Sequence, residues 1–265
     1  MAPLKETKRA LIVVRTYPTP AKKGVEVSCT AAITEDGQWL RLFPVPSRFL
    51  EPDQRFRKYQ WVEVSVTKAS DPRPESYKLA WPDPVNILSK PLPTANSWQA
   101  RKEIVLPLQA HCLCCLQREQ QAKGFPTLGI FRPHSIKRLI IAAASPDWTP
   151  EQQAILGQLD LFLKQPREKL EKVPFKFSYE FRCDHPECGG HTLMCTDWEA
   201  GEAWRKWKNE YGGGWEAKFR QRFEEEMIHK YDTHFYVGTV HQHPDAWIIV
   251  GLFYPPVEHQ GSLFG

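Results

Sequence analysis

Residues 175–199 read FKFSYEFRCDHPECGGHTLMCTDWE and hold, in order, a strand pattern, a run of metal-ligand side chains and a helix start. Aromatic side chains occupy every second position from Phe175 to Phe181, which predicts a strand with one buried face. Three cysteines and two histidines follow within thirteen positions. Thr196 and Glu199 have the spacing of a capping box, so a helix is predicted to begin there. This order predicts an α+β module pinned by a metal.

The ligand run favours a closed zinc site, because zinc prefers thiolate and imidazole ligands in a tetrahedron. Pro186 stiffens the turn between Cys183 and Cys188, and Gly189-Gly190 suits the positive φ of a turn around a metal. The layout of residues 175–230 is similar to zinc-knuckle and treble-clef sites, although the usual pair of two-residue cysteine spacings is absent. The predicted ligands of one structural zinc are Cys183, Cys188, His191 and Cys195.

Three alternatives to this ligand set stay open. His185 can displace His191, or a later histidine can replace Cys195. The later candidates are His229, His234, His241 and His243. No metal at all also fits the pattern, because free cysteine is among the most buried residue types. A second cluster, residues 111–115, lies on a predicted helix, where burial of small thiols is a better interpretation than a metal or redox pair.

The N-terminal part has the pattern of a small β-barrel. Residues 61–68 alternate between valine and polar side chains, as a half-buried strand does. Further strands are predicted at residues 10–14, 25–33 and 38–43, and Asp36-Gly37 favours a tight hairpin between the last two. Proline-rich connections at residues 70–95 then predict a boundary.

The rest of the chain mixes helices and strands. A helix over residues 97–123 is predicted to break at Pro107 and stop at Gly124. Thr149-Pro150 starts another helix. The remaining predicted elements are a strand at 135–143, helices at 197–210 and 215–230, and a hairpin at 235–241 and 247–254. We therefore predict an α+β fold in three parts: a basic β-rich module (1–95), a helical subdomain (96–172) and a zinc-binding α+β module (173–265).

Composition indicates a cytoplasmic protein. The seven cysteines are odd in number and clustered, unlike a disulfide framework, so a reducing compartment is expected. The sequence has no run of about 18 apolar residues, as a membrane span requires, and its first residues lack the apolar region of a signal peptide.

Positive charge is concentrated in the first two thirds of the chain. Residues 1–95 carry 15 Lys and Arg against 10 Asp and Glu, whereas residues 173–265 carry 9 against 14. A polyanion would therefore bind the N-terminal or middle part. Trp39 and Phe43 fit a barrel core as well as a stacking surface. The candidate phosphate-facing residues are Lys22, Lys23, Arg41, Arg48, Arg55, Arg57 and Lys58.

Several segments resemble an uncharacterised family of bacterial proteins. These segments are RTYPTP (15–20), CTAAITEDGQWLRLFPVPSR (29–48), KYQWVEVSVTK (58–68), RPESY (73–77) and WIIVGLFYPP (247–256). The resemblance covers most of the chain and implies an association with defence or mobile-element gene clusters. It implies no assigned activity.

Together these patterns predict a non-catalytic nucleic-acid-binding or adaptor protein with a structural zinc. Its expected partners are DNA or RNA, with protein partners in a larger complex as a further expectation. One alternative is a metal-dependent, nuclease-like hydrolase that uses His241 and His243. A protein-only scaffold subunit is another. No phosphate-binding glycine loop, nucleophile elbow or dinucleotide fingerprint occurs in the sequence.

Overall fold

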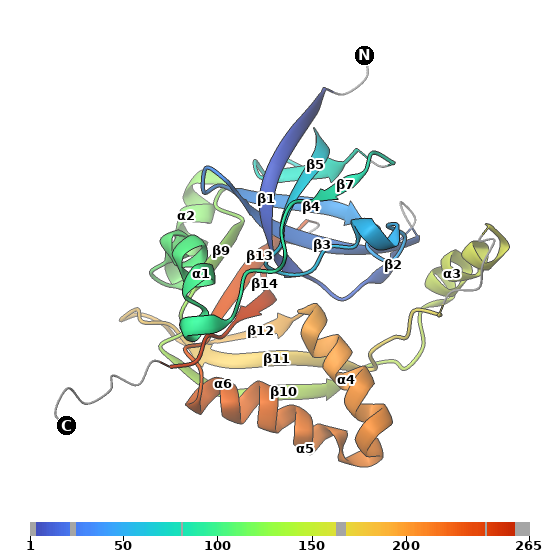
Figure 1. Cartoon of the computed structure of the whole chain (residues 1–265). Helices are drawn as coiled ribbons and strands as arrows, with labels where there is room; N and C mark the ends of the chain where they lie inside the picture. The colour runs from blue at the N-terminus through green and yellow to red at the C-terminus, as the bar shows by residue number, and fades with distance from the viewer. Residues whose placement is uncertain (1–3, 22–24, 81, 163–167, 242, 258–265) are drawn as a thin grey trace.

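The computed structural model describes residues 4–21, 25–80, 82–162, 168–241 and 243–257. It confirms the α+β class: a closed β-barrel lies above a second, seven-stranded sheet, and helices cover one face of that sheet (Figure 1). None of the helices in these residues is long and apolar enough to cross a membrane.

Five strands close the N-terminal barrel in the order β1-β3-β4-β6-β5, and β5 pairs back to β1. They are β1 (Lys5–Arg15), β3 (Val25–Thr34), β4 (Trp39–Val45), β5 (Trp61–Lys68) and β6 (Ser76–Leu79). The short strands β2 (Thr19–Ala21) and β7 (Val85–Ile87) pair with β3 and β5. Val62, Val64 and Val66 point into the barrel core, as their alternation predicted.

The second sheet has the order β10-β11-β12-β14-β13-β9-β8. Its strands are β8 (Gln109–Ala110), β9 (Leu128–Phe131), β10 (Ser135–Ala143), β11 (Phe175–Arg182), β12 (His191–Cys195), β13 (His234–Val240) and β14 (His243–Phe253). The predicted strand at 135–143 and the closing hairpin are present. Because β8, β9 and β10 pair within this sheet, residues from the predicted middle and last parts of the chain share one layer.

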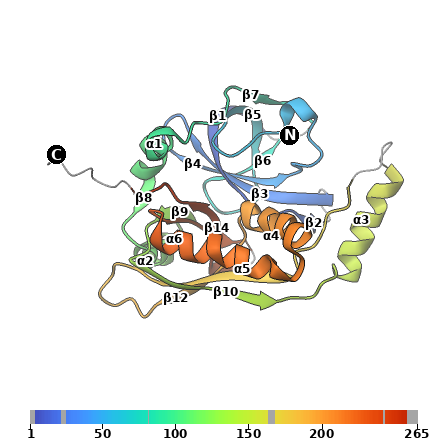
Figure 2. The same cartoon turned by 60° about the horizontal axis from the view of Figure 1, so that its bottom comes forward.

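The helices are α1 (Ala95–Val105), α2 (Leu113–Lys123), α3 (Pro150–Phe162), α4 (Trp198–Tyr211), α5 (Trp215–Arg220) and α6 (Glu226–His229). A π-helical turn at Gln221–Glu225 joins α5 to α6. These last helices lie against β10, β11 and β12, whereas α3 stands apart beside the barrel (Figure 2). The predicted alternating aromatics of β11 meet them: Phe177 stacks on Phe219 with 4.4 Å between ring centroids.

The predicted helix limits are mostly correct. Residues 97–123 form two helices separated at Pro107, and Gly124 ends α2 with a φ of 77°. Thr149 caps α3 through a reciprocal bond pair with Gln152. The cap of α4 differs from the prediction, because Asp197 is the N-cap residue in place of Thr196 and accepts a bond from the Glu199 N–H.

The barrel and the second sheet share part of their core. Leu11 and Val13 of β1 lie in one buried cluster with Tyr236 of β13 and Phe253 of β14. A backbone hydrogen bond also joins the two parts. The N–H of Tyr17, just after β1, donates to the Thr196 carbonyl at 3.0 Å. The two sheets therefore form one packed unit rather than two beads on a linker.

Gly201 of α4 makes this junction tight. A Cβ at Gly201 would lie 2.2 Å from Cδ2 of the Tyr17 ring, whose hydroxyl is held by the Glu171 carbonyl at 2.7 Å. We expect Gly201→Ala to lower the free energy of unfolding by about 1–3 kcal/mol through overpacking, as measured by denaturant unfolding. Gly157→Ala on the exposed side of α3 is the matched control, because no atom lies within 4 Å of its Cβ. An equal loss of unfolding free energy in both variants would show that the junction can accommodate the extra methyl group.

Candidate functional site

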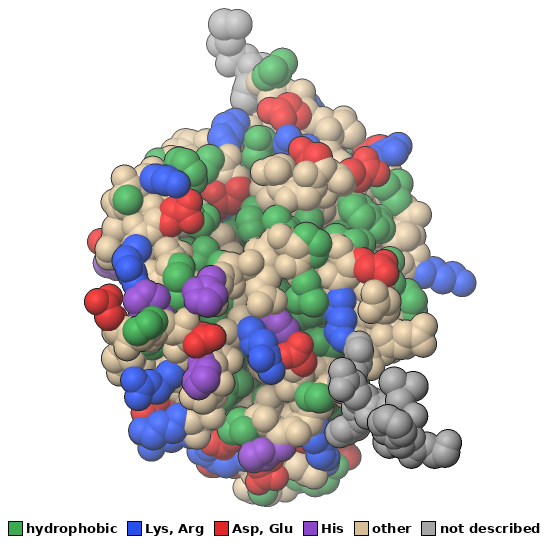
Figure 3. Space-filling view, turned by 90° about the vertical axis from the view of Figure 1, so that its left-hand side faces the viewer, with side chains coloured by type: hydrophobic (Ala, Val, Ile, Leu, Met, Phe, Trp, Pro, Cys, Tyr) green, Lys and Arg blue, Asp and Glu red, His purple; other side chains and the backbone are tan. Residues whose placement is uncertain are grey.

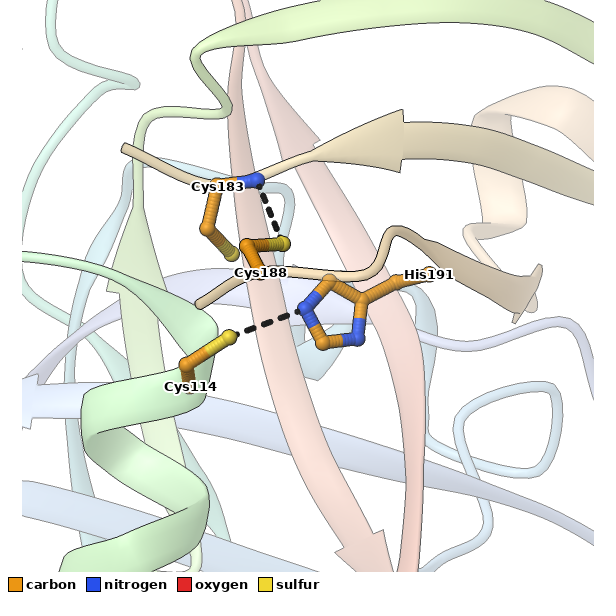
Figure 4. Close-up of side chains that lie close together, drawn as sticks. All are labelled: Cys114, Cys183, Cys188 and His191. Carbon is orange, nitrogen blue, oxygen red and sulfur yellow. Dashed lines mark hydrogen bonds between the residues drawn. The ribbon is translucent and has the colours of Figure 1, made fainter. Parts of the chain in front are cut away.

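Four side chains that can bind a metal meet at the end of the β11–β12 hairpin. They are Cys114, Cys183, Cys188 and His191, and their ligand atoms all lie within 4.8 Å of one another. Cys114 Sγ is 3.2 Å from His191 Nε2. Figure 4 shows the four side chains turned toward a common centre. This group could hold a metal ion.

Three different elements bring these side chains together. Cys183 directly follows β11, His191 is the first residue of β12, and Cys188 lies in the turn between them. Cys114 comes from the first turn of α2, where Cys112 is the N-cap residue. The start of α2 therefore lies beside the hairpin cysteines. The hairpin supplies three ligands and α2 completes the set.

Without a cation, burial disfavours charge on most of the group. Burial raises the pKa of Cys114 to about 12 and that of Cys183 to about 11. Burial also acts on Cys188, but the backbone N–H groups of Cys183 and Gly190 outweigh it and lower the pKa of Cys188. Burial lowers the pKa of His191, which keeps its imidazole neutral. The thiols are thus crowded and poorly solvated, and a divalent cation would replace their protons.

The donor set fits zinc. A tetrahedral zinc ion with bonds of about 2.0–2.3 Å places its ligand atoms roughly 3.3–3.8 Å apart. The ligand atoms of the group lie within 4.8 Å of one another, so a small adjustment would accommodate the ion. Three sulfurs and one imidazole are typical of a closed structural site. The nearest acidic residues along the loop, Asp184 and Glu187, have side chains 74% and 82% exposed. These carboxylates face solvent.

The fourth member of this group is Cys114, and the predicted Cys195 is not part of it. Cys195 ends β12, pairs with Phe177 of β11 and is buried in the core of the second sheet. Among the alternatives, His185 lies in the loop beside Arg118, and His241 lies beside Asp71 of the barrel at 3.4 Å. Within the described residues the group includes no later histidine, so the arrangement that the hydrolase alternative requires is not met.

A second candidate site lies where the barrel meets the start of α4. An open hollow of about 800 Å³, here called the outer groove, has basic and aromatic walls formed by Arg15, Arg48, Arg55, Phe56, Arg57 and Trp198. Its acidic residues are Glu51 and Glu168. The Arg15 guanidinium lies between two rings, 4.8 Å from the centroid of Trp198 and 5.6 Å from that of Phe56.

A smaller hollow of about 380 Å³, here called the inner pocket, adjoins the outer groove. Arg15, Arg57 and Trp198 line both. The other residues that give the inner pocket its character are Lys58, Tyr59, Trp98, Arg101, Glu199 and Tyr254. Both hollows are thus built from the barrel on one side and from α4 on the other.

The structure places the predicted phosphate-facing residues in different environments. Lys22 and Lys23 lie outside the described residues. Arg41 is not on the surface: it is 3% exposed and donates to Glu75 and to the Thr127 carbonyl. Phe43, which fitted a core, is 46% exposed. The four that line the hollows are Arg48, Arg55, Arg57 and Lys58.

Lys58 is neutralised by the buried carboxylate of Asp197 and the partly buried one of Glu199. Its Nζ lies 3.3 Å from Asp197 Oδ2 and 3.1 Å from Glu199 Oε1, and its side chain is 8% exposed. Burial opposes the charge of Lys58, but Asp197 and Glu199 outweigh it and raise its pKa well above the usual value. Asp197 also accepts the Leu252 N–H at 2.8 Å. Burial raises the pKa of Asp197 to about 6. Lys58 therefore fastens the barrel to α4 and β14.

Unpaired arginines gather at these hollows. Most arginines in the described part of the chain have a carboxylate within 4.0 Å, including Arg48, which pairs with Glu26. Those without one are Arg15, Arg55, Arg57, Arg101 and Arg182, and the first four line the outer groove or the inner pocket. By contrast, the face that carries α1 and α2 shows acidic and basic side chains interspersed with histidines (Figure 3). Four of the five described arginines without a carboxylate partner thus line these two hollows.

Sequence reasoning missed several of these residues. Cys114 was assigned to a buried helical cluster, although a thiol-rich segment at a helix start was its available signal. Arg15, Arg101 and Trp198 all lie outside the basic segment around residues 48–58. Nothing in the sequence pattern places these residues beside that segment.

Two family models together cover nearly the whole chain. Residues 109–265 match one described as Domain of unknown function (DUF8757), and residues 6–107 match one described as Domain of unknown function (DUF8758). No curated protein matches the chain.

Proposed function

The chain belongs to the family described as Domain of unknown function (DUF8757), and we propose that it binds single-stranded nucleic acid along the outer groove and holds a structural zinc. This role is one of binding, without catalysis. The observation that carries it is the set of arginines without carboxylate partners in a groove with aromatic rings.

The groove has the two features that single strands require. Positive side chains follow the backbone, and aromatic faces stack on unpaired bases whatever their sequence. Arg55 is held in place by the Leu50 carbonyl at 3.0 Å, whereas the Arg57 guanidinium has no hydrogen-bond or ion-pair partner among the described residues. Trp198 is half-buried and lies beside Arg15. A phosphate near Arg57 would thus have a base next to Trp198.

The zinc supports this groove indirectly. Cys188 and His191 stand at one end of β12, and Asp197, which closes the groove through Lys58, follows its other end. A metal that fixes the start of a five-residue strand also restricts where its end can lie. A reducing compartment such as the cytoplasm would keep the thiols available. An association with bacterial defence or mobile-element genes is part of the same proposal, since such systems handle nucleic acid.

Binding to a fluorescently labelled oligothymidylate of about twelve nucleotides tests the proposal. Affinity measured by anisotropy should fall as salt rises, with each phosphate contact contributing about −0.7 to the slope of log K against log[salt]. Arg57→Ala should make that slope shallower by about 0.7, because one contact is lost. Charge reversal in Arg57→Glu should weaken binding further.

Lys206→Glu is the control for net charge. Lys206 is exposed in the middle of α4 and lines neither hollow, so its reversal should leave the affinity nearly unchanged. Equal weakening by both reversals would indicate attraction to overall charge instead of a groove. Absence of binding at low salt would remove the proposal.

A further inference from the structure

The inner pocket is more elaborate than a site for phosphate alone requires. Its volume of about 380 Å³ falls in the range of small-molecule sites. Arg15, Arg57 and Trp198 form a wall that it shares with the outer groove. A strand in the outer groove would therefore pass beside it.

Rigid aromatic walls line this pocket. The Trp98 ring packs against Tyr254 and Phe253, with centroids 5.2 and 5.6 Å away. Asn96, Ser97 and Trp98 all have left-handed φ values, of 49°, 50° and 66°. Three successive residues other than glycine in this region are strained, and such strain persists where the surrounding structure holds a functional side chain in place. Here it presents Trp98 to the pocket.

Two guanidinium groups lie beside the aromatic rings of the pocket. Arg101 lies 4.1 Å from the Tyr59 ring centroid and is anchored by the Leu92 carbonyl. Arg15 lies 4.8 Å from the centroid of Trp198. Neither has a carboxylate within 4.0 Å among the described residues, so a ligand that supplies acceptors would be favoured.

Glu199 gives the pocket one acceptor among these donors. Its carboxylate receives the Tyr254 hydroxyl at 2.9 Å and faces the Lys58 ammonium. A site for phosphate would exclude a carboxylate, whereas the edge of a nucleobase carries both donors and acceptors. The combination of aromatic walls, guanidinium donors and one carboxylate matches a base better than it matches a phosphate.

We infer that the inner pocket receives one unstacked nucleobase of the strand bound in the outer groove. Trp98 and Trp198 offer it stacking surfaces, and Arg15 and Arg57 on the shared wall face its phosphate. The donors and the carboxylate of the pocket meet its edge. This inference rests on the proposed function.

A scan with abasic oligonucleotides tests it. Each oligothymidylate carries one abasic position and keeps its full charge, so phosphate contacts are unchanged. One position should weaken binding to the wild-type protein about tenfold, as expected for the loss of one stacked base. Trp98→Ala should weaken binding of the intact strand to a similar extent and should show little further loss with the abasic strand. Trp148→Ala, which lies outside both hollows, should retain the positional effect.

A measurement on the wild-type protein covers the case in which Trp98→Ala does not fold. 2-Aminopurine placed at the sensitive position should be quenched on binding, since it would stack on tryptophan. Binding that persists with equal affinity at every abasic position, and without quenching, would overturn the base pocket and leave the proposed function intact. Absence of any binding would instead overturn the proposed function.

Discussion

Cys114→Ala is expected to release the metal and to lower the free energy of unfolding by more than about 4 kcal/mol. Loss of a metal is among the few single changes with effects of that size, because the binding energy of a structural metal is folding energy. Cys114 joins α2 to the β11–β12 hairpin, so without it the hairpin's three ligands have no partner on the helix. Elemental analysis should give about one zinc per wild-type chain and little in the variant.

Two neighbouring cysteines are the controls. Cys115→Ala alters the next residue of α2, and Cys195→Ala alters the ligand that sequence spacing favoured; neither lies in the group. Both variants should retain the metal, with Cys195→Ala losing only the stability of a buried thiol. A Cys114→Ala protein that keeps its zinc, or a wild type that contains none and unfolds at the same temperature with and without chelator, would contradict the site.

Lys58→Met should lower the free energy of unfolding by about 3–5 kcal/mol at pH 8. Methionine fills a similar volume, but the change leaves the buried Asp197 and the partly buried Glu199 without their cation. Removing one partner of a buried ion pair is costly because the remaining charge is neither solvated nor paired. Denaturant unfolding measures the loss.

The pH dependence separates charge from packing. Loss of the Lys58 charge should raise the pKa of Asp197 above its value of about 6 in the wild type. A carboxyl whose pKa is raised by folding binds its proton more tightly when folded, so protonation stabilises the folded state as pH falls. The deficit of Lys58→Met should therefore be smaller at pH 5 than at pH 8. Glu199→Gln added to Lys58→Met should recover part of the loss, and a deficit equal at both pH values would mean that only packing was lost.

Local sequence patterns predicted those helices and strands whose ends and buried faces follow from their own residues. The alternation in Trp61–Lys68 predicted both ends of β5 correctly, and Gly124 predicted the end of α2. The pairing of β1 with β5 that closes the barrel was not predictable in the same way, because it depends on strands far apart in the chain. Asp197 caps α4 in place of Thr196. Its carboxylate is held at the helix start by the Leu252 N–H and the Lys58 ammonium, and these tertiary contacts do not show in the local sequence.

The metal group was predictable in part for the same reason. Cys183, Cys188 and His191 are close in the sequence and were found by their spacing. Cys114 lies far upstream, and only the fold shows that α2 begins beside the hairpin. The basic segment around residues 48–58 indicated one wall of the outer groove, whereas the opposite wall at Trp198 depends on how α4 meets the barrel.

The packing of α4 against the barrel constrains how the two halves of the chain can evolve. Arg55, Arg57 and Trp98 come from the N-terminal half of the chain, and Trp198 and Tyr254 from the C-terminal half, so neither half alone encodes a complete groove or pocket. The seam also contains matched pairs, such as Tyr17 with Gly201 and Lys58 with Asp197. A recombination event that replaced one half with that of a distant relative would have to bring both members of each pair, or the chimaera would neither pack nor bind. We therefore expect the two halves to be inherited together as one gene.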